Sequence, residues 1–138
     1  MPHRLILTLA VLAASGVLPA FATPAPARAR ARASIHVRPA AVRAGATTRV
    51  YGSAAGCELG DTVTLISSAF THAHDFAGLP AIFAHVHAGG RYSVHTRIPA
   101  GRRPSRYAIS ARCGGGNLGV HATITVLGAL SAAAWDAP

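Results

Sequence analysis

The sequence lacks lysine and has few acidic residues. All 13 of its basic residues are arginines, and acidic side chains occupy only four positions. Catalysis by general acids and bases needs carboxylates held together with tuned proton affinities. Glu58 and Asp61 share one turn, "CELGD", where such side chains commonly accept hydrogen bonds from backbone N–H groups. No Gly-x-Ser-x-Gly motif is present, and "CGGGN" lacks the Gly-Lys-Ser/Thr of a phosphate-binding loop. The sequence therefore predicts that the protein is not an enzyme.

Long apolar runs are absent except at the N-terminus. There, "LILTLAVLAASGVLPAF" follows Arg4, and "AFA" at 20–22 has the small-x-small pattern that signal peptidase cleaves. This pattern predicts a signal peptide over residues 1–22, and the alternative is an uncleaved N-terminal anchor. No later segment approaches the roughly 20 apolar residues that a spanning helix needs. We therefore expect a mature chain without a transmembrane segment, secreted and extracellular or associated with the cell wall.

Cysteine is scarce, with Cys57 and Cys113 as the only pair. In an exported chain, two cysteines most simply form one disulfide, because the compartment is oxidising. A redox or metal-ligand pair is the alternative, but the sequence contains no Cys-x-x-Cys motif.

A sustained apolar repeat of 3.6 residues is also absent. Instead, apolar residues alternate with polar ones, and Gly and Pro separate the segments. Seven short strands are predicted, over residues 34–39, 47–53, 62–67, 81–88, 91–98, 106–113 and 118–126. Around them, "TPAPARARARA" at 23–33 predicts a disordered basic spacer, and 128–138 a flexible tail. We therefore expect an all-β domain over residues 34–127, folded as a β-sandwich.

Two features predict an immunoglobulin-like sandwich of about seven antiparallel strands. Cys113 has the inward parity of the sixth strand and Cys57 closes the second, so their disulfide would join the two sheets. Tyr107 begins the sixth strand, where such sandwiches place a tyrosine whose hydroxyl bonds back to a neighbouring loop. The stretches "GSAAGCELGDTVTL" and "IPAGRRPSRYAISARCGGGNLGVHATITV" also resemble small secreted immunoglobulin-like proteins of actinobacteria. That resemblance implies a fold and a location, and no activity.

Histidines are concentrated in "THAHDFAGLPAIFAHVH" at 71–87. Residues i and i+2 of a strand share a face, so His85 and His87 point outward. A three-residue turn between strands 81–88 and 91–98 would pair Val86 with Val94 and His85 with His95. The connection over residues 68–80 precedes strand 81–88. If this connection folds over the outward face, a Zn or Cu site would form. Its predicted ligands are His72, His74, His85, His87 and His95. The alternatives are incidental surface histidines and a pH-responsive surface.

Positive charge dominates the mature chain, which carries 12 arginines against four carboxylates. Such a balance favours anionic partners, although it also simply keeps a small protein soluble. We expect contact with an anionic surface through Arg102, Arg103 and Arg106. Phe70, Phe76 and Phe83 surround the 68–80 connection, either pinning it to the core or forming an exposed apolar patch. Aromatic residues are otherwise sparse, so no specific nucleic acid is expected.

These features together predict a secreted, non-catalytic immunoglobulin-like binding or structural module at the cell envelope. Its expected partner is an anionic cell-wall polymer or another envelope protein. The alternative functions are an extracellular β-sandwich that binds a transition metal through the histidine cluster, and a hydrolase of unrecognised type.

Overall fold

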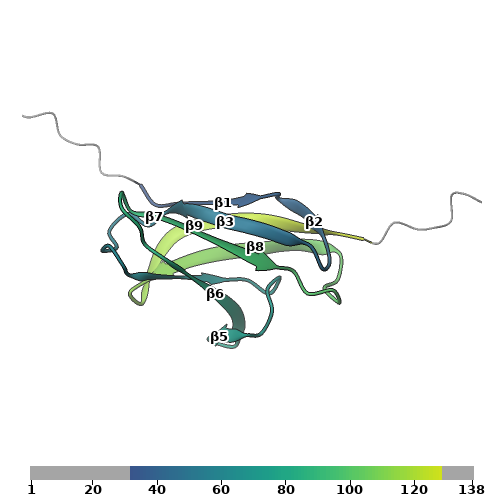
Figure 1. The fold of residues 1–138 in the computed structure, drawn as a ribbon. Helices are drawn as coiled ribbons and strands as arrows, with labels where there is room; N and C mark the ends of the chain where they lie inside the picture. The colour runs from purple at the N-terminus through teal and green to yellow at the C-terminus, as the bar shows by residue number, and fades with distance from the viewer. Residues whose placement is uncertain (1–31, 129–138) are drawn as a thin grey trace, which may run out of the picture.

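The computed structural model describes residues 32–128, which form nine β-strands in two sheets (Figure 1). The prediction of an all-β domain is therefore confirmed. The predicted signal peptide at 1–22 lies outside the described residues, as do most of the spacer and of the tail. Within residues 32–128 no helix is long and apolar enough to cross a membrane.

The smaller sheet, which we call sheet A, is antiparallel and has β3 at its centre. Its strands, in spatial order, are β1 (Ser34–Arg38), β3 (Thr47–Ser53) and β7 (Arg91–Arg97). The central strand pairs along its whole length with β7, from Thr47 opposite Arg97 to Ser53 opposite Arg91. Because β3 is paired on both sides, it fixes which outward side chains of β1 and β7 become neighbours.

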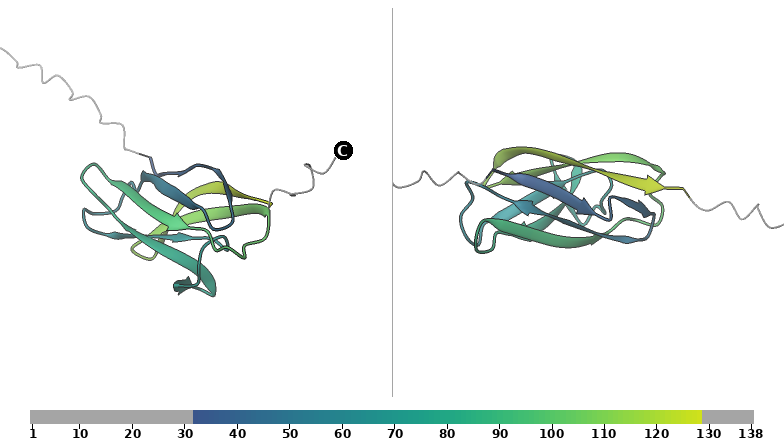
Figure 2. Two further views of the ribbon diagram at one scale, coloured as in Figure 1. Left: turned by 45° about the vertical axis from the view of Figure 1, so that its right-hand side comes forward. Right: turned by 90° about the horizontal axis from the view of Figure 1, so that it is seen from above.

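The larger sheet, sheet B, has six strands and curls around its long axis (Figure 2). Its strands, in spatial order, are β2 (Ala41–Arg43), β9 (Gly116–Leu127), β8 (Ser105–Cys113), β4 (Thr62–Ile66), β6 (Leu79–His85) and β5 (His74–Phe76). All pairs are antiparallel except β2 and β9, which run parallel.

The core lies between the sheets and is built from the alternating apolar residues of the sequence. Val50 and Tyr92 enter it from sheet A, and Leu65, Ile109 and Ile124 from sheet B. Burial of an aliphatic side chain of this size stabilises the fold by about 1.5–3 kcal/mol. The inward parity predicted for these strands is confirmed.

Tyr92 illustrates how tightly sheet A packs. Its side chain is 2% exposed, and its hydroxyl donates a hydrogen bond of 2.9 Å to the backbone oxygen of Ser34. Gly52 lies opposite Tyr92 in the register. A Cβ at position 52 would lie 2.0 Å from the Ser34 oxygen and 2.8 Å from the Tyr92 hydroxyl. Only glycine allows the backbones of β1 and β3 to approach in this way.

The predicted hairpin between strands 81–88 and 91–98 is wrong. β6 belongs to sheet B and β7 to sheet A, and one isolated bridge between His87 and Arg91 links the two segments. The chain crosses from one sheet to the other at the turn of Gly89 and Gly90, which both have positive φ. The physical reason is that each sheet needs an apolar inner face. Val94 contributes to the inner face of sheet A, where it pairs with Val50 of β3 instead of with Val86.

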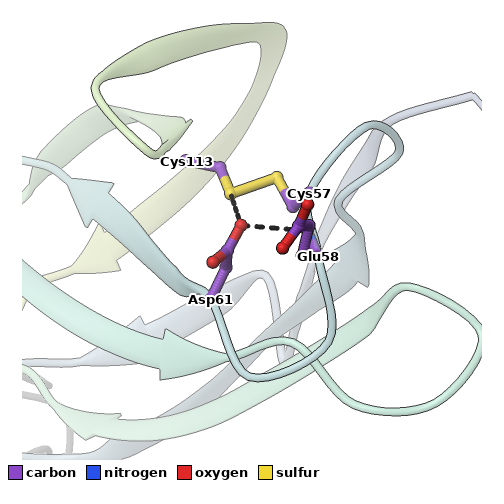
Figure 3. The surroundings of a disulfide bond; sticks show 4 residues. All are labelled: Cys57, Glu58, Asp61 and Cys113. Carbon is purple, nitrogen blue, oxygen red and sulfur yellow. Dashed lines mark hydrogen bonds between the residues drawn. A yellow bond between two sulfur atoms is a disulfide. The ribbon is translucent and has the colours of Figure 1, made fainter.

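The disulfide between Cys57 and Cys113 is present, with the two Cα atoms 6.3 Å apart (Figure 3). Its position differs from the predicted link between strands, because Cys57 lies in the connection that follows β3. The bond joins this connection to the last residue of β8. Beside it, the Asp61 carboxylate accepts a hydrogen bond of 2.9 Å from the backbone N–H of Glu58, as predicted for this turn. An oxygen of Asp61 also lies 3.8 Å from Cys113 Sγ, but a disulfide sulfur has no hydrogen to donate.

Candidate functional site

The outward face of sheet A gathers arginines from all three of its strands. We call this surface the arginine face. Its four arginines are Arg38 on β1, Arg49 on β3, and Arg91 and Arg97 on β7, and all are exposed. They share one face because each has outward parity on its strand. The sequences of β1, β3 and β7 contain no acidic residue.

The register of sheet A orders these side chains in rows across the strands. One row contains Arg38, Arg49 and His95, and the next contains His36, Tyr51 and Ser93. The Ser34–Ser53 pair extends to Arg91 beyond the second row, and Arg97 lies beyond the first, opposite Thr47. Like charges directly opposite on neighbouring strands destabilise a sheet, so the Arg38–Arg49 pair repels. A bound anion would relieve that repulsion.

Few protein groups neutralise the arginine face. Arg49 Nε donates to the hydroxyl of Ser93 at 2.7 Å, and Arg97 Nε donates to the backbone oxygen of Gly45 at 2.7 Å. Both acceptors are uncharged, and each guanidinium has further N–H donors. Within residues 32–128 the single close contact between a basic and an acidic side chain joins His72 Nδ1 and Asp75, 2.9 Å apart, on the β5 side of sheet B. The arginines of sheet A therefore keep their charge available to an outside partner.

Two shallow hollows lie on this face, one on either side of Tyr51. The first, of about 410 Å³, is bordered by His36, Tyr51, Ser93 and Arg91. The second, of about 430 Å³, is bordered by Arg38, Thr47, Tyr51 and His95. Arg49 lines both hollows. Arg49 and Tyr51 therefore border both hollows of the arginine face.

The structure separates the histidines predicted to bind a metal. His85 pairs with Thr62 in sheet B, whereas His95 pairs with Arg49 in sheet A. His87 borders the arginine face, and His74 packs its ring 4.8 Å from that of Phe83. Across residues 32–128 no group of three or more His, Cys, Asp or Glu side chains is placed to hold a metal ion. The predicted cross-strand geometry is wrong, and metal binding itself stays a prediction.

The three arginines predicted to contact an anionic surface differ in availability. Arg102 is partly buried and donates a hydrogen bond of 2.7 Å to the backbone oxygen of Phe70, so it ties two connections together. Arg103 and Arg106 remain exposed. Arg38 and Arg49 were missed as site residues because the sequence does not reveal that their strands are neighbours. The available signal was the alternation of arginine with apolar residues in "HVR", "TRV" and "VHTR".

A second exposed cluster lies on the outward face of sheet B. Phe76, Leu79 and Phe83 are 36%, 48% and 44% exposed, and the Arg112 guanidinium carbon lies 5.0 Å from the ring centroid of Phe76. Phe70, in contrast, is fully buried. Phe70 thus pins the connection to the core, whereas Phe76 and Phe83 belong to an exposed apolar patch.

No protein-family profile matches the chain, and no curated protein matches it. Among solved structures, it is similar to a Pseudomonas fluorescens alkylpurine DNA glycosylase, AlkC, bound to DNA containing an abasic site analog. The identity is 18% and the TM-score 0.44, over 71% of this chain. The match spans 31% of the glycosylase chain, about a third of its length. A likeness of this size assigns neither an activity nor a fold.

Two expectations from the sequence differ from what this neighbour is, and they are not proposed again. The glycosylase is an enzyme, which stands against the prediction that the protein is not one. It is also bound to DNA, which stands against the prediction of an anionic cell-wall polymer or envelope protein as partner, with no specific nucleic acid. Neither expectation is retained. The resemblance to secreted actinobacterial proteins stays a prediction.

Proposed function

We propose that the protein is a secreted immunoglobulin-like module that binds anionic polymers through the arginine face of sheet A. The observation that carries this proposal is the row of Arg38, Arg49 and His95 on strands without a carboxylate. Arg97 lies beside this row, and Arg91 lies beyond the neighbouring row. Arginine suits this role because its planar guanidinium presents several N–H donors to phosphate, sulfate or carboxylate oxygens.

Strand order supports the immunoglobulin-like part of the proposal. An immunoglobulin sandwich places strands A, B and E in one sheet, and G, F, C and C′ in the other. Sheet A has the order β1-β3-β7, and sheet B contains β9-β8-β4-β6. The hydroxyl of Tyr107 donates a hydrogen bond of 2.7 Å to the backbone oxygen of Arg103, as expected of a corner tyrosine. Secretion is supported by the signal-like sequence at 1–22 and by the disulfide.

Retention on immobilised heparin tests the proposal with two charge-matched variants. Arg38→Gln with Arg49→Gln removes two charges from the arginine face, and Arg103→Gln with Arg106→Gln removes two from elsewhere. We expect the first pair to elute at clearly lower salt and the second to elute near the wild type. Binding to a soluble polyanion should weaken with salt, and the slope of log K against log salt should fall by about one for each contacting arginine lost.

Two outcomes would overturn the proposal. Equal effects of both variant pairs would show that net charge, and no particular face, drives retention. Retention that persists at high salt would show that charge is not the cause.

A further inference from the structure

Tyr51 occupies the centre of the arginine face. It lies on the middle strand and lines both hollows. The guanidinium carbon of Arg49 lies 5.0 Å from its ring centroid, and the ring of His36 lies 5.4 Å away at an interplanar angle of 33°. These three flat groups form one cluster, which we call the stacking cluster.

The stacking cluster is bracketed by positive charge along the strand direction. Arg91 lies in the next row on one side of Tyr51, and Arg38 and Arg49 lie in the next row on the other. A flexible chain that runs along the face would meet an arginine, then flat rings, then arginines again. A ligand chain that fits this surface should therefore carry anionic groups that alternate with planar groups.

The Tyr51 side chain is less constrained than those of the two other described tyrosines. Tyr92 and Tyr107 each donate their hydroxyl to a backbone oxygen, whereas the hydrogen bonds among residues 32–128 include none from Tyr51. A cross-strand aromatic pair can stabilise a sheet by itself. That role, however, needs neither the surrounding arginines nor the two adjoining hollows.

We infer that the polyanion is a single-stranded nucleic acid, whose phosphates contact the arginines and whose bases stack on His36, Tyr51 and Arg49. This inference rests on the proposed function and names its ligand. Proteins that bind single strands combine a positive surface with aromatic side chains and arginine planes on which unpaired bases stack. Sulfated polysaccharides and inorganic polyphosphate carry charge but offer no aromatic ring to the cluster.

The experiment compares three labelled probes of one length, using the oxidised protein at one salt concentration. They are a thymidine oligonucleotide, an oligomer with the same phosphate backbone but no bases, and a DNA duplex. We expect the thymidine strand to bind about tenfold more tightly than the abasic strand. The duplex should show no such gain, because its bases are already stacked and paired.

Tyr51→Leu isolates the stacking contribution, with Phe83→Leu as the matched control on the other sheet. We expect Tyr51→Leu to lower affinity for the thymidine strand about tenfold and to leave the abasic strand unchanged. Phe83→Leu should change neither. Thermal unfolding of both variants checks that the fold persists, and His36→Gln provides a second variant of the cluster.

The outcomes separate this inference from the proposed function. Equal wild-type affinity for the thymidine and abasic strands would overturn nucleic-acid recognition while leaving polyanion binding intact. A preference for bases that survives both Tyr51→Leu and His36→Gln would overturn the assignment to this cluster. Failure to bind any probe or heparin would overturn the proposed function itself.

Discussion

At the scale of single residues, Gly52 shows how one missing side chain permits the contact between β1 and β3. Gly52→Ala would place a Cβ 2.0 Å from the backbone oxygen of Ser34. Because this neighbour is backbone and cannot rotate away, the strands must separate. We expect a loss of about 3 kcal/mol in the free energy of unfolding, measured by urea denaturation. Gly101→Ala is the control, since a Cβ there meets no atom within 4 Å. Equal stability of the two variants would contradict the interpretation that a Cβ at position 52 forces β1 and β3 apart.

Tyr92 predicts a loss of stability at high pH. Burial raises the pKa of Tyr92 from 10.0 to about 12. The folded state therefore retains a proton that the unfolded state releases. Its contribution is complete below pH 10 and is lost as the pH rises from 10 to 12, by up to about 2 kcal/mol.

Denaturation at a series of alkaline pH values measures this effect. Tyr92→Phe should be somewhat less stable at neutral pH, because it loses the hydrogen bond to Ser34. It should nevertheless lose less stability than the wild type above pH 10. Tyr107→Phe serves as the control and should keep the alkaline sensitivity. If the free energy of unfolding of Tyr92→Phe falls above pH 10 as much as that of the wild type, the fall is caused by other groups.

At the scale of elements, strand positions were predictable from sequence, but strand partners were not. The range of β3 was predicted without error, and β7 ends one residue earlier than expected. β2 and β5 were missed because three residues are too few to show an alternating pattern. The predicted partner of β7 was wrong because the alternating pattern places Val94 on the inner face whichever sheet the strand joins. Only the packing of both sheets decides that it faces Val50 and not Val86.

The separation of β6 from β7 predicts the outcome of a metal titration. His85 and His95 lie on different sheets, and across residues 32–128 no three His, Cys, Asp or Glu side chains are placed to hold one ion. We expect calorimetry with Zn²⁺ or Cu²⁺ to detect no site tighter than about 10 µM that depends on both His85 and His95. A tighter site that disappears both in His85→Ala and in His95→Ala would contradict the described arrangement.

At the scale of the whole molecule, the disulfide restricts the unfolded chain. Its cysteines are separated by 56 positions. On the chain-entropy model, closing a loop of this length stabilises the fold by about 4 kcal/mol, a large fraction of the stability of a small domain. Replacing both cysteines by alanine should lower the free energy of unfolding by about this amount. Denaturation of the variant and of the reduced wild type should agree. A much smaller loss would indicate that the unfolded chain is already compact.

The arginine face is also a property of the whole molecule, since it exists only when three strands assemble. The outward arginines could be recognised one strand at a time, from "HVR" or "VHTR". Their convergence could not, because β1 and β7 are about 60 residues apart in the chain and meet only through β3. The arginine face could therefore not be predicted without knowing the register of sheet A.

The parallel pairing of β2 with β9 has a mechanical consequence. The start of β1 and the end of β9 lie at opposite ends of the molecule (Figure 1). A force applied to these two ends pulls β2 and β9 in opposite directions along their common axis. The hydrogen bonds between them are then loaded together in shear, instead of opening one after another. Single-molecule stretching should therefore show one abrupt rupture, and Val42→Pro, which removes a backbone donor from β2, should lower the force at which it occurs.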